Sequence, residues 1–192
     1  MLNHSRQCFY KKNKSGFTIV ELMVSIAIIS ILIAIALPNF SDFIIRTRVD
    51  NEISELHRLL LTARNTAINS EQNVTICPLG TGSTCNNNWQ NELSVFVDAD
   101  SDGVLDNGEA LVKTKGAIDS GDKLQFSVNS LTYMPSGRLL VAASNRFNYC
   151  PKDNEDFSRG IEVSSSGRFN TTSDTDNDGK DETRAGTEIT CS

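Results

Sequence analysis

The feature that most constrains this chain is an apolar run of 21 residues, 17–37, in which Glu21 is the single charged residue. A run of this length can cross the hydrocarbon core of a membrane as one helix. The rest of the chain is polar and rich in Asn, Asp, Ser and Thr. The sequence therefore predicts one membrane-spanning helix joined to a water-soluble body.

The charges on either side of the run give it a direction. Residues 1–16 contain four Lys or Arg and no acid, whereas the chain after Gly16 contains 14 basic and 24 acidic residues, a net charge of −10. Basic flanks stay in the cytoplasm, so we expect the body outside it. Small residues precede the apolar run instead of following it, which argues against an ordinary cleaved signal peptide.

Glu21 is expensive in a membrane, because an ionised side chain at the centre of a spanning helix costs about 2.5–3.5 kcal/mol on insertion scales. The run contains no cation. If the chain were cut after Gly16, Phe17 would gain a free amine, and Glu21 of one subunit could pair with that amine in a neighbour. The charge would then favour polymerisation.

Residues 14–24, Lys-Ser-Gly-Phe-Thr-Ile-Val-Glu-Leu-Met-Val, resemble the class III leader and first helical turn of type IV pilins and type II secretion pseudopilins. The resemblance implies that a prepilin peptidase cuts after Gly16 and methylates Phe17, and that Glu21 acts in assembly. It also implies a single-pass protein of the bacterial inner membrane with a periplasmic C-terminal domain, which later enters a pilus or pseudopilus. The alternative is an ordinary single-span anchor.

A second helical pattern follows the apolar run. Its apolar residues recur every three or four positions, at Ile45, Val49, Ile53, Leu56, Leu60, Ala63 and Ala67. This spacing predicts an amphipathic helix to about Ile68, with the apolar stripe docked on the body. The other positions carry charged residues such as Arg48, Glu52 and Arg58, which we expect to face solvent. Pro38 should kink or locally melt the helix.

Short β-prone runs separated by Gly- or Pro-containing turns follow the helix. They cover residues 74–77, 93–97, 110–112, 124–128, 139–142 and 161–164. They predict antiparallel sheet, in two small layers packed on the helix, with Trp89 and Phe96 in the core. We therefore divide the chain into a leader (1–16), a transmembrane and assembly helix (17–37), its amphipathic continuation (38–68) and a globular β domain (69–192).

The order of motifs along the body resembles that of the GspH/FimT group of minor pilins and pseudopilins. It runs from Ala-Arg-Asn-Thr-Ala-Ile at 63–68, through Val-Thr-Ile-Cys at 74–77 and Met-Pro-Ser-Gly-Arg at 134–138, to Ser-Gly-Arg at 166–168. The resemblance implies an α+β, type IV pilin-like fold, in which a long N-terminal helix packs on an antiparallel β domain.

Five cysteines are present, with Cys8 in the leader and four in the body: Cys77, Cys85, Cys150 and Cys191. An even set of four in an exported domain predicts two disulfides. Cys77 and Cys85 flank a Gly- and Pro-containing loop, which suggests a local bond, and the other two would then fasten the tail. Three connectivities are open to a set of four.

Two acidic loops have the spacing of a calcium loop. The first has carboxylates at loop positions 1, 3, 5, 9 and 12 and Gly at position 6, and its candidate ligands are Asp98, Asp100, Asp102, Val104, Asp106 and Glu109. The second, 174–182, repeats the pattern less completely. Calcium takes six to eight oxygens, and the Gly permits the turn that converges alternate side chains. The alternative is a solvated acidic hairpin. No cofactor is required, and calcium is the one ion that these features suggest.

The residue inventory argues against an enzyme. His57 is the one histidine that processing would leave, it lies on the long helix, and the chain has no P-loop or dinucleotide motif.

The leading hypothesis is a structural subunit: a minor pilin or pseudopilin that acts in filament initiation or tip assembly, in pilus biogenesis or protein secretion. Its expected partners are other minor subunits, the major pilin and the prepilin peptidase. The alternative is a FimT-like DNA-binding minor pilin for natural transformation, with Arg168 of the last Gly-Arg motif on the DNA. The net charge of the body argues against that role, because Lys and Arg contacts to phosphate dominate DNA affinity. The sequence does not choose between a pilus and a secretion system.

Overall fold

The computed structural model describes residues 16–141 and 145–191. These residues divide between two compact units, 1–41 and 42–192, and one long helix, α1 (Ile19–Ser70), contributes to both. The expected leader, which contains Cys8, lies outside the described residues except for Gly16.

The first unit is the N-terminal part of α1. Thr18 caps the helix, because its hydroxyl accepts a hydrogen bond from the Glu21 backbone N–H at 3.2 Å. The large apolar side chains from Ile19 to Ile35 are 50–75% exposed within the single chain. No single helix in the described part of the chain is long and apolar enough by itself to cross a membrane, and segments 19–35 and 40–70 pass that test only as a bent pair.

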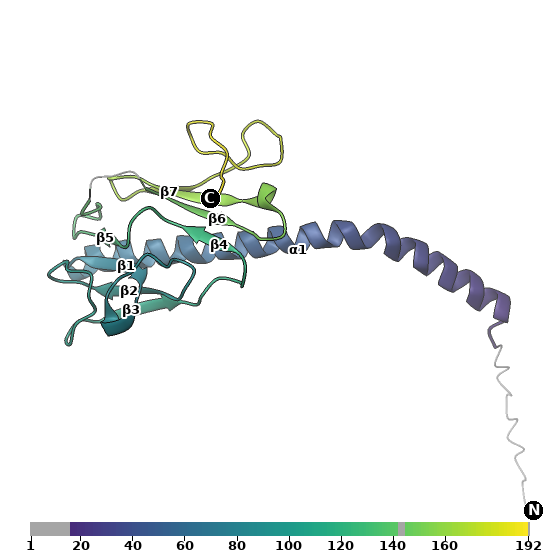
Figure 1. Ribbon diagram of the computed structural model, residues 1–192, viewed down its shortest axis with the longest axis horizontal. Helices are drawn as coiled ribbons and strands as arrows, with labels where there is room; N and C mark the ends of the chain where they lie inside the picture. Colours follow the sequence, from purple (N-terminus) through teal and green to yellow (C-terminus); the bar gives the residue numbers. More distant parts are fainter. Residues whose placement is uncertain (1–15, 142–144, 192) are drawn as a thin grey trace, which may run out of the picture. The chain divides into compact units, whose positions relative to one another are not determined.

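The second unit contains two antiparallel four-stranded sheets (Figure 1). The strands are β1 (Val74–Pro78), β2 (Leu93–Val97), β3 (Leu111–Lys115), β4 (Lys123–Gln125), β5 (Leu131–Tyr133), β6 (Asn145–Cys150), β7 (Arg159–Val163) and β8 (Phe169–Thr171). One sheet has the order β3-β2-β1-β5 and the other the order β4-β6-β7-β8. Two short 3-10 helices, Thr81–Ser83 and Glu155–Phe157, lie in the connections. The unit is α+β, as predicted.

The core lies between the second half of α1 and both sheets. The predicted apolar stripe of the helix, from Ile45 to Ala67, is buried there together with residues of β1, β2, β4, β5, β6 and β7. Trp89, in the β1–β2 connection, packs against the side of the other sheet, since its ring meets Phe126 and Phe147 edge-on and its indole N–H donates to the Val128 carbonyl at 2.8 Å. The predicted burial of Trp89 and Phe96 is confirmed.

The strand prediction was wrong in four places. It missed β5, β6 and β8, and the expected strand 139–142 is a single bridge from Leu139 to Tyr133, followed by a bend at 140–141, while residue 142 lies outside the described residues. The polar residues of β6 explain one omission, because Asn148 resembles a loop residue in the sequence. In the structure its amide accepts from Arg146 at 2.6 Å and donates to the Thr190 carbonyl at 3.0 Å.

Two disulfides close segments of the second unit. Cys77 at the end of β1 is bonded to Cys85, and Cys150 at the end of β6 is bonded to Cys191. Of the three connectivities open to the sequence, this is the one that the structure contains. The second bond ties the C-terminal segment to the sheet that contains β6.

The two Gly-Arg turns meet backbone to backbone. Gly137 and Gly167 have φ angles of +72° and +76°, and a Cβ atom on Gly167 would lie 1.9 Å from the Gly137 carbonyl oxygen. Leu139 N–H also donates to the Ser165 carbonyl at 3.2 Å. Only glycine therefore fits at position 167, for steric as well as conformational reasons.

We predict that Gly167→Ala lowers the free energy of unfolding by about 3 kcal/mol or more, because the new methyl group would separate the two turns. Gly186→Ala is the matched control, since Gly186 has a φ of +78° but a Cβ atom added there would meet nothing within 4 Å. The control should cost only the backbone strain, about 1 kcal/mol. Urea unfolding of the detergent-solubilised chain measures both, and equal losses would contradict the steric argument.

Candidate functional site

Glu21 lies in the first turn of α1, four residues after Phe17, and its side chain is exposed among exposed apolar side chains. The helix N-terminus favours a negative charge at this position. Residues 16–41 contain no Lys or Arg. A cation that neutralises Glu21 must therefore come from outside this segment or from a newly formed N-terminus.

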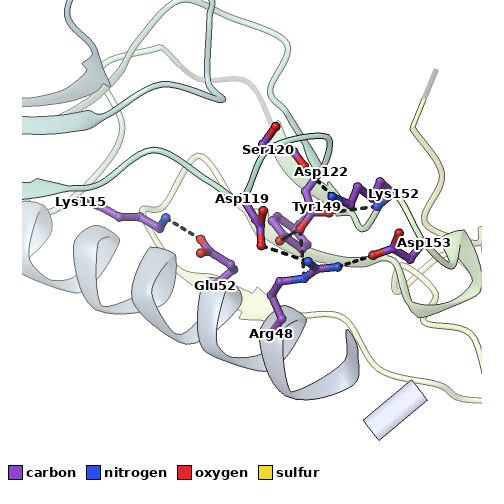
Figure 2. A network of polar contacts seen from close by, with 9 residues as sticks. All are labelled: Arg48, Glu52, Lys115, Asp119, Ser120, Asp122, Tyr149, Lys152 and Asp153. Carbon is purple, nitrogen blue, oxygen red and sulfur yellow. Dashed lines mark hydrogen bonds and ion pairs between the residues drawn. The ribbon is translucent and has the colours of Figure 1, made fainter. Parts of the chain in front are cut away.

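A network of ion pairs attaches α1 to the body in the second unit. Figure 2 shows the Arg48 side chain extending from the helix toward three carboxylates. Its guanidinium lies 3.0 Å from Asp119, 3.3 Å from Asp122 and 3.0 Å from Asp153. Asp119 and Asp122 belong to the β3–β4 connection and Asp153 to the β6–β7 connection, so one side chain joins the helix to both sheets.

Asp122 is the buried centre of this network, and its side chain has no exposed surface. The Tyr149 hydroxyl donates to one carboxylate oxygen, and the backbone N–H of Lys152 donates to the other at 3.0 Å (Figure 2). Burial raises the pKa of the Tyr149 phenol, and the neighbouring Asp122 carboxylate raises it further. The Tyr149 hydroxyl therefore stays protonated, and remains a hydrogen-bond donor, over the physiological pH range.

One helical turn beyond Arg48, the charges are reversed. The ammonium of Lys115, at the end of β3, is buried and lies 2.5 Å from the Glu52 carboxylate of α1 (Figure 2).

Burial alone would lower the pKa of Arg48, but its hydrogen bonds to Asp153 and Asp119 outweigh that effect and raise the pKa.

The expectation that Arg48 and Glu52 simply face solvent was wrong. The side chain of Arg48 is 21% exposed and that of Glu52 is 20% exposed, and both form ion pairs with side chains of the body. Their partners are scattered along the chain, between residues 115 and 153, so helical periodicity could not identify them. The one signal for these ion pairs in the sequence was the presence of charged residues on the helix together with the acidic, Gly-containing segment 116–122. Arg58 behaves as expected, being exposed and 3.9 Å from Glu55.

The first acidic loop brings together three of its predicted ligands. Ligand oxygens of Asp98, Asp100 and Asp102 lie within 4.8 Å of one another. Glu109 is not in this group, since its carboxylate accepts from the backbone N–H groups of Ala99 at 2.9 Å and Asp106 at 3.1 Å. Calcium binding by the loop, with Val104 and Asp106 as further ligands, stays a prediction.

Asp98 is fully buried at the end of β2. One carboxylate oxygen accepts from the Thr75 hydroxyl at 2.6 Å, and the other has no hydrogen-bond partner among the described residues. Burial raises the pKa of Asp98, and the charges of Glu109 and Asp102 add to the rise, while the Thr75 hydrogen bond opposes it. The ionised form of Asp98 is therefore energetically unfavourable in the absence of a cation.

The second acidic loop gathers four carboxylates, those of Asp174, Asp176, Asp178 and Glu182, again within 4.8 Å. The first three are exposed and Glu182 is buried.

Arg168, the residue that the DNA-binding alternative requires, is exposed in the turn between β7 and β8. His57 is half-buried and packs edge-on against Phe169, with 4.8 Å between the ring centroids.

Comparisons with known proteins decide the family. A family model described as type II transport protein GspH matches residues 52–167, and the prokaryotic N-terminal methylation motif matches residues 11–37. The chain belongs to the GspH family. It is accordingly of the minor pilin and pseudopilin kind, a family of structural subunits of type IV pili and type II secretion systems. The methylation motif and the long N-terminal helix of this GspH-family chain fit a pilin anchored in a membrane.

Individual relatives agree with this assignment. The chain is 39% identical to a fimbrial protein of Pseudomonas aeruginosa over 61 residues, which cover 32% of this chain and 40% of the relative. It is also 39% identical to the type IV major fimbrial protein FimA of Dichelobacter nodosus over 74 residues, 38% of this chain and 47% of the relative. The matches thus span less than half the length of these relatives.

The crystal structure of the type IV minor pilin FimU of Pseudomonas aeruginosa shares the fold. Its TM-score is 0.54 at 20% sequence identity, and the match covers 65% of this chain and 88% of that one. The predicted type IV pilin-like architecture is confirmed.

We predict that Arg48→Ala lowers the free energy of unfolding by about 2–3 kcal/mol, because it leaves the buried Asp122 without its cation beside two further carboxylates. Arg58→Ala removes the same charge from an exposed pair on the same helix and should cost about 0.5 kcal/mol or less. Chemical denaturation of the two variants tests this difference. An Arg48 variant as stable as the Arg58 variant would show that the network contributes little.

We predict that Asp98→Asn is more stable than the wild type at pH 7 in the presence of a chelator, by about 1 kcal/mol, because it removes a buried charge. Since the pKa of Asp98 is raised above its ordinary value, folding binds a proton, and the carboxylate lowers stability as the pH rises through that window. The advantage of the variant should therefore shrink toward pH values of about 4. A difference independent of pH would refute this account.

Proposed function

We propose that this GspH-family protein acts in the initiation or tip assembly of a type IV pilus-like or type II secretion filament, together with other minor subunits and the major pilin. The observation that carries the proposal is Glu21, a single carboxylate in the first turn of α1, where the large apolar side chains from Ile19 to Ile35 are exposed. Such a helix requires either lipid or other helices around it.

The processing chemistry supplies the missing cation. In this proposal a prepilin peptidase removes residues 1–16 and methylates the amine of Phe17. The segment 17–37 anchors the protein in the inner membrane by a single pass, and the amphipathic part 38–68 carries the β domain 69–192 into the periplasm. Because segment 16–41 has no cation of its own, the amine of an adjacent subunit is the natural partner of Glu21.

The attached body suits a structural role. Arg48 and Glu52 hold the helix to both sheets through ion pairs with buried or half-buried partners. Residues 42–192 therefore form one compact unit that a filament could carry at its end. FimU, which shares the fold, is a type IV minor pilin, and this supports the same class of role for this chain.

We predict that Glu21→Ala lowers incorporation into sheared filaments at least about tenfold, because the charge pair that favours helix association is lost, while membrane insertion is retained or improved. Asp42→Ala is the matched control, an exposed acid of the same helix outside the apolar run. Immunoblots of membranes and filaments measure the two distributions, and mass spectrometry checks that each variant begins at a methylated Phe17.

Normal incorporation of the Glu21 variant would refute the assembly mechanism. Immunogold labelling of the wild type tests the position in the filament, with label expected at the filament ends. Label distributed evenly along the filament would refute the initiation or tip role while leaving the role of Glu21 intact.

A further inference from the structure

The C-terminal segment between β8 and Cys191 contains six acidic and two basic residues and has no part in the proposed assembly mechanism. Its carboxylates alternate along the chain at Asp174, Asp176 and Asp178, and Glu182 follows after Gly179. One oxygen from each of these four acids lies within 4.8 Å of the others. In the described part of the chain, none of the four forms an ion pair with Lys or Arg.

Backbone hydrogen bonds fix the loop in this conformation. The Asp174 carboxylate accepts from the N–H groups of Asn177 at 2.7 Å and Gly179 at 2.9 Å. Asp178 accepts from Lys180 N–H at 2.9 Å. Each of these contacts uses one carboxylate oxygen, and Asp178 has a second oxygen left for another ligand.

Glu182 gives the independent indication of a ligand. It is only 5% exposed, and its Oε2 accepts from both the N–H and the hydroxyl of Thr175, each at 2.7 Å. Its Oε1 is buried with no hydrogen-bond partner among the described residues. A buried carboxylate oxygen without a partner is costly, and a cation would remove that cost.

The ammonium of the loop itself is occupied elsewhere. Lys180 follows Gly179 in the loop, but its side chain lies 3.1 Å from Glu188 and 3.7 Å from Asp156. Asp181, which precedes Glu182, pairs with Arg159 at 2.9 Å. These neighbouring charges are therefore satisfied, while the four-acid cluster retains a surplus of negative charge.

We propose that Asp174, Asp176, Asp178 and Glu182 bind one calcium ion. Calcium accepts several carboxylates in a flexible arrangement of six to eight oxygens, whereas magnesium demands a near-ideal octahedron and keeps most of its water. The spacing also places Lys180 where calcium loops use a backbone carbonyl. This inference does not rest on the proposed function.

The ion would fasten the C-terminal segment, which the Cys150–Cys191 disulfide also ties to the sheet that contains β6. Glu182 forms bridges to Ser173 and Glu188, and Ile189 in the following segment is buried. In Figure 1 the segment after β7 forms the yellow loops on the outer side of the sheet that contains β6 and β7. Calcium binding would thus stabilise the end of the chain against that sheet.

Equilibrium dialysis with radioactive calcium tests the proposal on the full chain, solubilised in detergent and stripped with a chelator. Glu182→Gln should bind one calcium ion fewer than the wild type, or bind it at least about tenfold more weakly. Glu92→Gln, which removes one exposed acid outside both loops, is the matched control and should bind as the wild type does. Asp176→Asn, at an exposed position, should show the same loss without altering a buried group.

Three further measurements test whether the calcium ion binds at residues 174–182. Asp100→Asn in the first acidic loop should leave the ion at 174–182 in place. Calcium at about one hundred times its Kd should raise the Tm of the wild type by about 5 °C and that of Glu182→Gln by less. Magnesium should bind this loop at least about tenfold more weakly than calcium. Unchanged calcium binding in both Glu182→Gln and Asp176→Asn, or no calcium binding by the wild type, would overturn the proposal.

Discussion

Burial of the apolar stripe on α1 is the interaction on which the second unit depends. Each of its two sheets has four short strands, and the described residues offer no second long helix to cover them. A sheet with one apolar face must bury it against another element, and here the stripe from Ile45 to Ala67 meets both sheets at once. The helix is therefore part of the fold of the body as well as a continuation of the N-terminal segment.

The ion pairs of α1 add information that the apolar stripe lacks. Apolar contacts are non-directional, so a stripe of similar side chains tolerates small rotations and shifts of the helix. Arg48 and Glu52 lie one turn apart on the same side and face partners of opposite sign, Asp122 and Lys115. A rotation or shift would separate both pairs at once and leave the two partners buried and unpaired. We infer that these contacts fix the position of the helix more than they add to stability.

The sequence was most informative where a pattern is local. The period of the apolar residues predicted α1 and its buried stripe, and the spacing of the acids pointed to the two loops in which carboxylates gather. It was least informative where partners come from distant parts of the chain. The strand β6 was missed because Asn145 and Asn148 lower its β-propensity, yet Asn148 is satisfied by the far C-terminal Thr190. Arg48 was expected to face solvent because its partners, like that of Asn148, lie far away along the chain.

Each acidic loop is connected to a disulfide, the first by a hydrogen bond and the second along the chain, and repulsion between the carboxylates bears on the second of these connections. Cys85 N–H donates to the Gly103 carbonyl of the first loop at 2.8 Å, and Cys191 ends the segment that contains the second. Clustered carboxylates repel one another and favour open conformations of a loop. The Cys150–Cys191 bond closes a segment that contains the second loop, and it restricts those open conformations because it limits how far the ends of that segment can separate. The second disulfide therefore helps to hold the second carboxylate cluster closed. In each cluster one buried acid, Asp98 or Glu182, retains an oxygen without a hydrogen bond among the described residues.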